Sequence, residues 1–274
     1  MVTAETTRGT PRLVATDLDG TIVPWDGEIS DRTVSALKAV ESQGVPVVFV
    51  TGRPPRWLPD VAARTGHTGL AICANGALLY DMHTDRIVDT FPLSVEVGLE
   101  VVRRLRAALP DVAFAVETAE GFAHEPRYVS RYDAGRQREI AAIEEIYAGP
   151  ATKLLARHEA MGMEEFHSAA REVVGDLAEL THSGGHGALL EISAAGVSKA
   201  STLAIVCEQR GIDAADVVAF GDMPNDLPML LWAGQPYAVR TGHPDVVAAV
   251  DDLVDPPEQD GVARALERLF DLRP

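Results

Sequence analysis

The stretch VATDLDGTIVP, residues 14–24, ends an apolar run with two aspartates placed two residues apart. The apolar residues 13–15 predict a buried β-strand, and Gly20 predicts a turn directly after it. Because successive residues of a strand point to opposite faces, Asp17 and Asp19 can project to the same side. The stretch therefore predicts two carboxylates at the carboxyl end of a strand.

A calcium-binding loop is one alternative interpretation of this stretch. Acidic and hydroxyl residues alternate from Asp17 onward, and Glu28 is the twelfth residue of such a loop. A calcium loop needs Gly at the sixth position for its sharp turn, and this chain has Ile22 there. Pro24 also lies inside the loop, and no helix is predicted before it. We therefore favour a catalytic pair of aspartates.

The composition is that of a globular protein with an acidic surface. The chain has 274 residues, of which 46% are hydrophobic, enough for one large domain or two modest ones. Its net charge is −17 and its Lys and Arg residues form no cluster, so nucleic acid and anionic membrane are not expected partners. A phosphate compound would need local positive groups or a metal ion to overcome this field.

Further features indicate a cytoplasmic protein. Cys73 and Cys207 lie within apolar runs without CxxC spacing, as small buried residues do in a reducing compartment. The N-terminus has no apolar core of the kind found in signal peptides, and no apolar run approaches the length of a membrane span. We predict a flexible tail over residues 1–11 and a monomer or small homo-oligomer.

The first part of the chain alternates strands and helices. A helix is predicted over residues 31–43, with Ser30 as its N-cap and Gly44 after its end. Continuous apolar segments at 45–52 and 70–76 predict strands that are buried on both faces. Strand, helix and strand at this spacing indicate a parallel sheet with right-handed crossovers.

The pattern changes near residue 82 and returns near residue 194. The middle section has a predicted strand at RIVDTF, short strands at VAFAVE, TKLLA, LAELT and ALLEIS, and helices over 94–109, near 135–147 and over 161–174. The last section has helices near 199–209, 244–250 and 261–270 and strands at 217–222 and 237–239. We predict a discontinuous core domain, residues 12–81 and 194–274, with an α/β domain inserted at 82–193.

Four short stretches call for a joint explanation: DLDGT at 17–21, TGR at 51–53, Lys199 within GVSKA, and GDMPND at 221–226. Three of them lie where a buried strand ends, and the ligand crevice of an open α/β sheet lies outside the carboxyl ends of its strands. Convergence there would bring Asp17, Asp19 and Asp222 together as the oxygen ligands that Mg²⁺ prefers.

The same convergence would supply donors to an anion. Thr51, the backbone N–H of Gly52 and the ammonium group of Lys199 could donate to its remaining oxygens. Each stretch alone could be structural, as a plain turn, an exposed lysine or, at Asn225, a helix cap. However, a lysine in the first helical turn opposes the helix dipole, and the chain has only three lysines. The four stretches in this order favour one shared site.

In this order, and around an inserted domain, the stretches resemble the haloacid dehalogenase superfamily of phosphohydrolases. ANGA at 74–77 and the position of the insertion, between the third strand and Lys199, resemble its Cof-type branch with an α/β (type IIB) cap. The resemblance covers nearly the whole chain from residue 12. It implies an α/β fold, with a Rossmann-like doubly wound parallel sheet as the core and an inserted α/β cap domain.

The resemblance also implies a Mg²⁺-dependent phosphatase. Asp17 would be the nucleophile that attacks phosphorus and forms an aspartyl phosphate. Asp19 would protonate the leaving alkoxide and then accept a proton from the attacking water. This second aspartate favours a phosphatase over a dehalogenase, because a halide leaves without protonation. Mg²⁺ would be held by Asp17, the backbone carbonyl of Asp19, and Asp222.

The other motif residues would surround the phosphate. Its oxygens would be held by Thr51, Gly52, Lys199 and Asn225. Asp226 would order the groups around the metal ion and the lysine. Arg53 and Asn75 would face the cap and contact the leaving group.

The cap is expected to select the substrate. In the loop THSGGHG, His182 and His186 could reach the leaving group or simply decorate a hairpin. No zinc site is expected in that loop, because no cysteine lies nearby and no third ligand is evident. In ETAEGFAHEPRY, residues 117–128, His124 and Arg127 are the side chains most able to bind a polar substrate. Since the family commonly acts on phosphorylated sugars and related small metabolites, a sugar phosphate is the expected substrate.

Two other functions remain open. A phosphomutase of similar architecture would return the phosphoryl group to the sugar, and would need a cap that excludes water and binds a second phosphate. No basic cluster in the predicted cap supports this. A phosphometabolite-binding protein without turnover would be expected to lack the nucleophile, the proton shuttle or a metal ligand, and this chain has all three.

Overall fold

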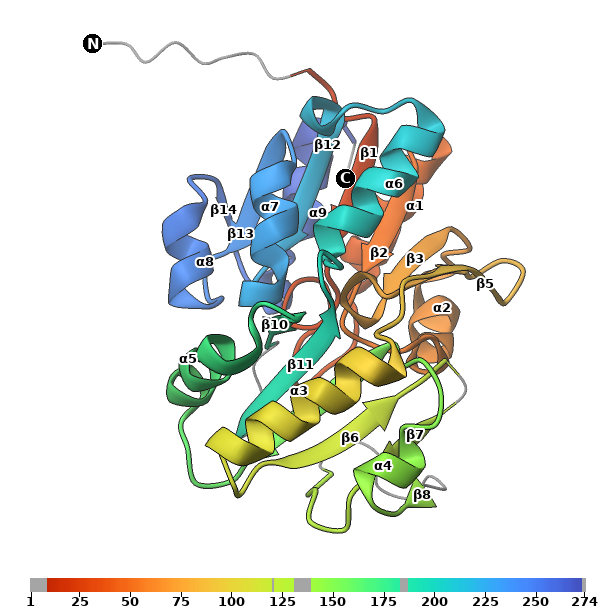
Figure 1. Ribbon diagram of the computed structural model, residues 1–274. Helices are drawn as coiled ribbons and strands as arrows, with labels where there is room; N and C mark the ends of the chain where they lie inside the picture. The colour runs from red at the N-terminus through yellow and green to blue at the C-terminus, as the bar shows by residue number, and fades with distance from the viewer. Residues whose placement is uncertain (1–8, 120, 131–138, 183–186, 273–274) are drawn as a thin grey trace.

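Two β-sheets organise the chain in the computed structural model, which describes residues 9–119, 121–130, 139–182 and 187–272 (Figure 1). The first sheet has eight strands in the order β14-β13-β12-β1-β2-β3-β4-β5. The second has six strands in the order β10-β11-β9-β6-β7-β8. We call the first sheet with its helices the core and the second with its helices the cap.

The first sheet is parallel through six strands and then antiparallel. Its parallel strands are β14 (Leu253–Val254), β13 (Gln235–Val239), β12 (Val217–Gly221), β1 (Leu13–Thr16), β2 (Val47–Val50) and β3 (Leu70–Cys73). The antiparallel strands β4 (Leu78–Asp81) and β5 (Arg86–Thr90) extend it at one edge. The parallel sheet expected from the continuous apolar strands is confirmed, and the fully exposed β5 belongs to this sheet too.

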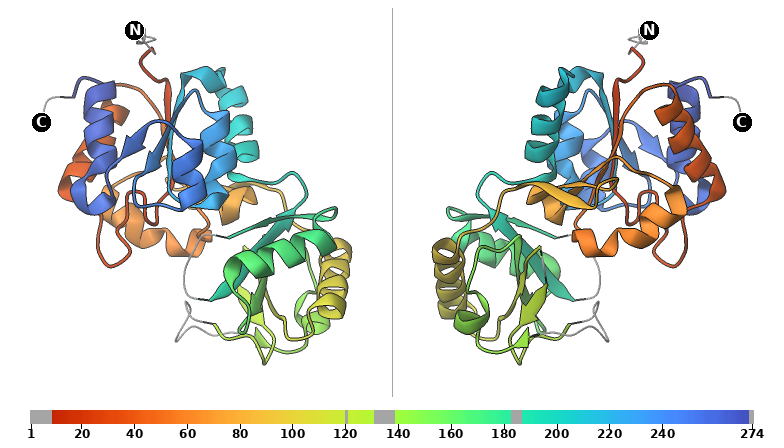
Figure 2. Two further views of the ribbon diagram at one scale, coloured as in Figure 1. Left: turned by 90° about the vertical axis from the view of Figure 1, so that its left-hand side faces the viewer. Right: turned by 90° about the vertical axis from the view of Figure 1, so that its right-hand side faces the viewer.

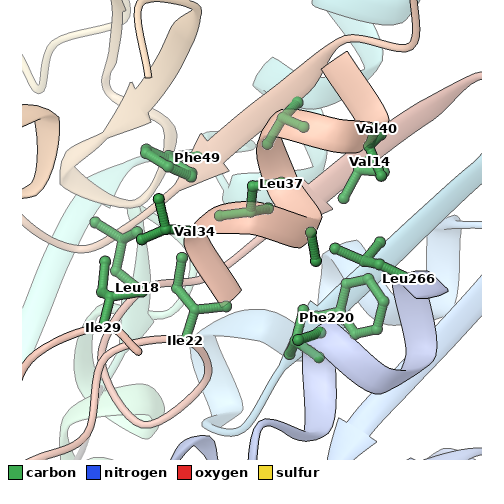
Figure 3. Close-up of a cluster of buried hydrophobic side chains, with 14 of the residues drawn as sticks. Val14, Leu18, Ile22, Ile29, Val34, Leu37, Val40, Phe49, Phe220 and Leu266 are labelled. Atoms are coloured by element: carbon green, nitrogen blue, oxygen red, sulfur yellow. The ribbon is translucent and has the colours of Figure 1, made fainter. Parts of the chain in front are cut away.

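Helices cover both faces of the first sheet (Figure 2). One face is covered by α1 (Asp31–Ser42), α2 (Pro59–Thr65) and α9 (Gly261–Leu269), and the other by α6 (Lys199–Arg210), α7 (Leu227–Trp232) and α8 (Pro244–Ala249). The strand β1 shows why, since Val14 packs with the first group of helices while Leu13 and Ala15 pack with the second. Figure 3 shows Val14 in its cluster with Leu37 and Leu266. This is the predicted doubly wound arrangement.

The predicted N-cap of α1 is confirmed. The Ser30 hydroxyl oxygen accepts a hydrogen bond from the backbone N–H of Thr33 at 3.1 Å, and α1 ends at Ser42. Such a cap satisfies one of the backbone donors that a helix start leaves without a partner.

The cap sheet is mostly antiparallel, with helices against one face. Its strands are β6 (Ala113–Glu117), β7 (Phe122–His124), β8 (Glu139–Ile140), β9 (Lys153–His158), β10 (Ala178–Thr181) and β11 (Ala188–Ala194). The helices α3 (Val95–Ala108), α4 (Ile143–Ile146) and α5 (Met163–Val174) pack on the face that includes Leu154 and Ala156. The alternate residues Lys153 and Leu155 point to the other face, which is turned toward the core.

One predicted cap element was wrong. The helix expected near 135–147 is present only as α4, because residues 139–140 form β8 and pair with β7. This strand pairing outweighs the helix propensity of the segment. Residues 135–138 lie outside the described ranges.

Two further observations concern the ends of the chain and its helices. Of the predicted tail, residues 1–8 lie outside the described ranges, while the Gly9 carbonyl accepts a hydrogen bond from Gln235 Nε2 at 2.8 Å. None of the helices in the described part of the chain combines the length and apolar composition of a membrane-spanning segment.

Candidate active site

The carboxyl ends of β1, β2 and β12 bring the predicted motif residues together. Asp17 follows β1, Thr51 follows β2 and Asp222 follows β12, and all three are buried. The Asp17 N–H continues the strand pairing by donating to the Phe220 carbonyl at 3.0 Å. Neighbouring parallel strands thus place the polar residues that follow them at one edge of the sheet.

Lys199, at the start of α6, completes this group. Its Nζ lies 2.6 Å from Asp17 Oδ1 and 2.6 Å from Asp226 Oδ1, and its side chain is fully buried. Burial alone lowers the pKa of Lys199, but the two carboxylates outweigh it and raise the pKa. The two ion pairs compensate for a cation in the first turn of a helix.

The other oxygen of Asp226 fixes the loop after β12. Asp226 Oδ2 accepts the backbone N–H groups of Asp222 and Met223, each at 3.0 Å. One carboxylate therefore orients both the lysine and the loop that carries Asp222.

The geometry of the turn after β1 explains why DLDGT has a glycine at position 20. The Thr21 hydroxyl donates to Asp222 Oδ1 at 2.9 Å, so the turn after β1 closes on Asp222. Gly20 has φ +81°, and a Cβ there would lie 2.2 Å from Asp222 Oδ2. Only glycine permits this close approach.

The buried aspartates fit a divalent cation. Carboxylate oxygens of Asp17, Asp222 and Asp226 lie within 4.8 Å of one another. Burial, partly opposed by Lys199, raises the pKa of Asp17 to about 7. Burial and the Asp17 charge raise the pKa of Asp222 to about 9. Three clustered carboxylates beside a single ammonium group attract further positive charge, and their hard oxygens suit Mg²⁺.

Asp19 lies nearer to solvent and is held by Arg53. Arg53 Nε donates to Asp19 Oδ2 at 2.8 Å, and a second guanidinium nitrogen contacts Asp19 Oδ1. The backbone N–H of Arg53 donates to the Thr51 hydroxyl at 3.1 Å. The TGR stretch is thereby tied to the second aspartate of DLDGT.

A cavity of 330 Å³ lies over these residues, between core and cap. The predicted site residues that line it are Asp17, Asp19, Gly52, Arg53 and Asn225. The core also contributes Trp25, Pro54, Trp57 and Met223. The cap contributes Glu117, Phe122, Tyr128, Ser130, Lys153, Leu155, Leu189 and Glu191. Core and cap together thus enclose a space next to the predicted nucleophile.

Asn75 connects the core motif to the cap. Its Oδ1 accepts from Asn225 Nδ2 at 3.0 Å, and its Nδ2 donates to Glu191 Oε2 at 3.0 Å. Asn75 has φ 58°, a left-handed conformation that asparagine tolerates better than most residues. This placement agrees with the expectation that Asn75 faces the cap.

Three charged cap residues at the site were missed in the sequence. Lys153 Nζ donates to the Gly52 carbonyl at 2.9 Å and also contacts Glu191. Glu117 pairs with Arg56 of the core, with Oε2 at 3.0 Å from an Arg56 nitrogen. A usable signal was the alternation of β6, β9 and β11, since a charged residue stands on the same face of each strand.

Of the four residues proposed as tentative cap contacts, the three that lie within the described ranges do not line the cavity. Arg127 is exposed, pairs with Asp111 at 3.6 Å and does not line the cavity. His124 is buried, with Nδ1 2.7 Å from the Glu125 carbonyl oxygen, and His182 makes edge-to-face ring contacts with two other histidines. His186 lies outside the described residues. The loop 117–128 does line the cavity, but through its aromatic residues and Glu117.

Comparisons with known proteins agree with this geometry. Residues 14–266 match the family model for haloacid dehalogenase-like hydrolases. The chain is 28% identical to a phosphoglycolate phosphatase from Methanopyrus kandleri over 260 residues, which cover 94% of this chain and 97% of that protein. It is 25% identical to a pyridoxal phosphate phosphatase from Escherichia coli over 268 residues, covering 93% and 97% respectively.

Solved structures share the fold. A Streptococcus mutans protein, SMU.1108c, superimposes with a TM-score of 0.82 at 17% identity, covering 95% of this chain and 99% of that one. The phosphatase BT1666 from Bacteroides thetaiotaomicron gives a TM-score of 0.78 at 22% identity, covering 97% of each chain. With a family model matching nearly its whole length, this chain belongs to the haloacid dehalogenase-like hydrolase family, and it is an enzyme of the phosphatase branch.

Proposed function

We propose that this enzyme is a Mg²⁺-dependent phosphomonoester hydrolase that forms an aspartyl phosphate on Asp17 and acts on small phosphorylated metabolites, sugar phosphates first among them. One observation carries the proposal. The buried pair of Asp17 and Lys199 lies beside Asp222 and Asp226, and Asp17 lines a cavity that Asp19 also lines. This arrangement supports a site in which nucleophile, cation and second carboxylate would surround one phosphoryl group.

The chain orients its own nucleophile. Lys199 binds Asp17 Oδ1 at 2.6 Å, so the other carboxylate oxygen is the one that attacks phosphorus. The same ammonium group also offers hydrogen bonds to the phosphoryl oxygens, together with the N–H of Gly52 and the Thr51 hydroxyl. Mg²⁺ held by Asp17, Asp222 and the Asp19 carbonyl would supply positive charge that keeps Asp17 ionised and offsets its repulsion from the phosphate.

Asp19 then moves the proton. Its carboxylate lines the cavity, which the leaving group would occupy, and is oriented by Arg53. In its protonated form Asp19 would donate a proton to the departing alkoxide, and the resulting carboxylate would later accept one from the water that hydrolyses the aspartyl phosphate. Two proton transfers with one carboxylate return the enzyme to its starting state.

The cavity favours a compact leaving group with polar and apolar faces. Its 330 Å³ lies at the lower end of the range for small-molecule sites. Aromatic side chains, including Trp57 and Tyr128, can pack against a ring, while Lys153 and Glu191 can bind hydroxyl groups. A phosphorylated sugar fits both features. Similar proteins are phosphatases for phosphoglycolate and pyridoxal phosphate, so both belong among the candidates.

The test is release of inorganic phosphate, with and without Mg²⁺, from sugar phosphates, phosphoglycolate, pyridoxal phosphate, nucleotides and an aryl phosphate. We expect Mg²⁺-dependent release that Asp17→Asn abolishes, while Asp213→Asn, an exposed change away from the cavity, leaves it intact. If folded, metal-loaded protein is stabilised by these compounds and releases no phosphate, the chain is a binding protein instead. Transfer of phosphoryl to a sugar in place of water would identify a mutase.

A further inference from the structure

A second group of metal-binding side chains lies between cap and core, apart from the catalytic aspartates. Glu164 lies on α5, His182 follows β10, and His243 precedes α8. The Nε2 atoms of His182 and His243 lie 3.8 and 3.7 Å from Glu164 Oε1. The ligand atoms of all three lie within 4.8 Å of one another. Two ligands belong to the cap and one to the core.

These distances suit tetrahedral coordination. Ligand atoms about 2.0–2.2 Å from a zinc ion at tetrahedral angles lie about 3.4 Å from each other. The observed 3.7 and 3.8 Å therefore require only small side-chain movements. Two histidines and a glutamate form a known zinc ligand set that leaves a fourth position open. The Glu164 side chain is 71% exposed, so an ion can enter from solvent.

The histidine environments also fit. His182 is buried, and the rings of His167 and His243 meet it edge-on, so its imidazole is held in place beside Glu164. His243 Nδ1 accepts the N–H of Asp245 at 3.3 Å, and Asp245 Oδ2 lies 3.8 Å from it. Metal binding through Nε2 would move the His243 proton to Nδ1, which then gives up the hydrogen bond from the Asp245 N–H. Asp245 Oδ2 would have to move closer than 3.8 Å to accept a hydrogen bond from this Nδ1–H. Such a carboxylate–histidine–metal arrangement orients the ligand.

We propose that Glu164, His182 and His243 form a second metal site, which takes Zn²⁺ and fastens the cap to the core. Nitrogen ligands distinguish it from the all-oxygen aspartate cluster, which suits Mg²⁺. The sequence did not reveal the site because its ligands are far apart in the chain and meet only where the start of α5 approaches the residue before α8; Figure 1 shows these two helices in cap and core.

The site borders the catalytic loop. The backbone N–H of His243 donates to the Asp222 carbonyl at 2.7 Å. Because the cavity lies between cap and core, an ion that joins them hinders the opening that exchanges product for substrate. Bound Zn²⁺ therefore slows turnover without displacing Mg²⁺. This consequence rests on the proposed phosphatase function, whereas Zn²⁺ binding does not.

The experiment is a Zn²⁺ titration against a chromogenic chelator, with Mg²⁺ in large excess to occupy the aspartate cluster. We expect one tight Zn²⁺ per chain. Glu164→Gln, His182→Gln and His243→Gln should each weaken it by at least about tenfold. Glu165→Gln, next to Glu164 on the same helix, and the exposed His83→Gln are matched controls that should leave the affinity unchanged.

Two results would overturn the proposal. One is an unchanged Zn²⁺ affinity in Glu164→Gln, whose exposed side chain can be replaced without disturbing the fold. The other is loss of Zn²⁺ binding in Asp222→Asn, which would place the ion in the catalytic cluster. The fastening role is tested by unfolding temperature and turnover. Zn²⁺ should raise the unfolding temperature and slow turnover in the native chain but not in Glu164→Gln. Equal effects of Zn²⁺ on both proteins would refute the fastening role.

Discussion

Among single residues, Lys199 connects the chemistry of the site to its stability. Its buried ammonium group forms ion pairs with Asp17 and Asp226, and Asp226 in turn accepts hydrogen bonds from the N–H groups of the loop after β12. A buried charge that loses its partner is strongly destabilising, because the desolvation cost is no longer offset. The lysine therefore has a structural role in addition to any contact with phosphate.

Lys199→Met should lower the free energy of unfolding of the metal-free protein by about 3–5 kcal/mol, since it leaves two buried carboxylates unpaired. Lys38→Met, at an exposed position on α1, is the matched control and should change it by less than about 0.5 kcal/mol. Urea unfolding followed by circular dichroism measures both. Equal stability of the two variants would show that the ion pairs contribute nothing.

Three of the four motif stretches could be predicted to converge because each follows a recognisable strand, and parallel strands end at one edge of a sheet. For Lys153 and Glu191, the alternation along their strands could have predicted a shared face, but not that this face lines the cavity. Their strands read as apolar runs, and the sequence does not show which face of the cap sheet turns toward the core. Arg127 and His124 were chosen for their chemistry alone, and local contacts hold both elsewhere.

Among the elements, the approach of α6 to the turn after β3 positions the lysine. This turn, Ala74–Gly76, is held against α6 by the Thr202 hydroxyl, which donates to the Gly76 carbonyl at 2.7 Å. Gly76 has φ +108°, and a Cβ there would lie 2.2 Å from the Ser198 carbonyl oxygen. Glycine in ANGA thus permits the close contact that brings the start of α6 to β1.

Gly76→Ala should push the start of α6 outward and separate Lys199 from Asp17, which lowers phosphate release per folded molecule. Gly44→Ala is the matched control, because Gly44 also has positive φ but no atom within 4 Å of an added Cβ. We expect the control to lose about 1–2 kcal/mol of stability from backbone strain and to keep its specific activity. Specific activities that fall equally in the two variants would contradict this account of α6.

The core elements were predictable because continuous apolar strands and capped helices give strong local signals, as Ser30 does for α1. The local sequence signal of the segment near 135–147 was misleading. Its residues favour a helix, yet 139–140 pair with β7, a partner that only the tertiary fold supplies.

In the whole molecule, the net charge of −17 and the buried aspartates make metal binding and folding interdependent. The raised pKa values of Asp17 and Asp222 mean that the metal-free native state binds protons that the unfolded chain has already released. Stability then falls as the pH rises from the ordinary aspartate range through these raised values. A divalent cation that binds only the native state opposes this loss.

The metal-free protein should therefore lose stability between pH 5 and pH 8. Because one unit of pKa difference between the folded and unfolded states corresponds to about 1.4 kcal/mol, we expect a loss of a few kcal/mol. Asp222→Asn and saturating Mg²⁺ should each flatten this dependence, while the exposed Asp213→Asn should leave it unchanged. Thermal unfolding across this pH range makes the measurement. If stability instead rises with pH, or if Asp222→Asn leaves the slope of stability against pH unaltered, then burial and charge repulsion do not raise the pKa values of these aspartates.

The most direct test of the central claim is a search for the phosphoryl group on Asp17. Asp19→Asn, incubated with Mg²⁺ and an aryl phosphate whose leaving group needs no protonation, should be phosphorylated yet hydrolyse the intermediate about 10²–10⁴-fold more slowly. Mass spectrometry of the acid-quenched protein should then find one phosphoryl group on the peptide that contains Asp17, and none in Asp17→Asn. Phosphate release with the Asp17 peptide unmodified, or a label on another residue, would contradict nucleophilic catalysis by Asp17.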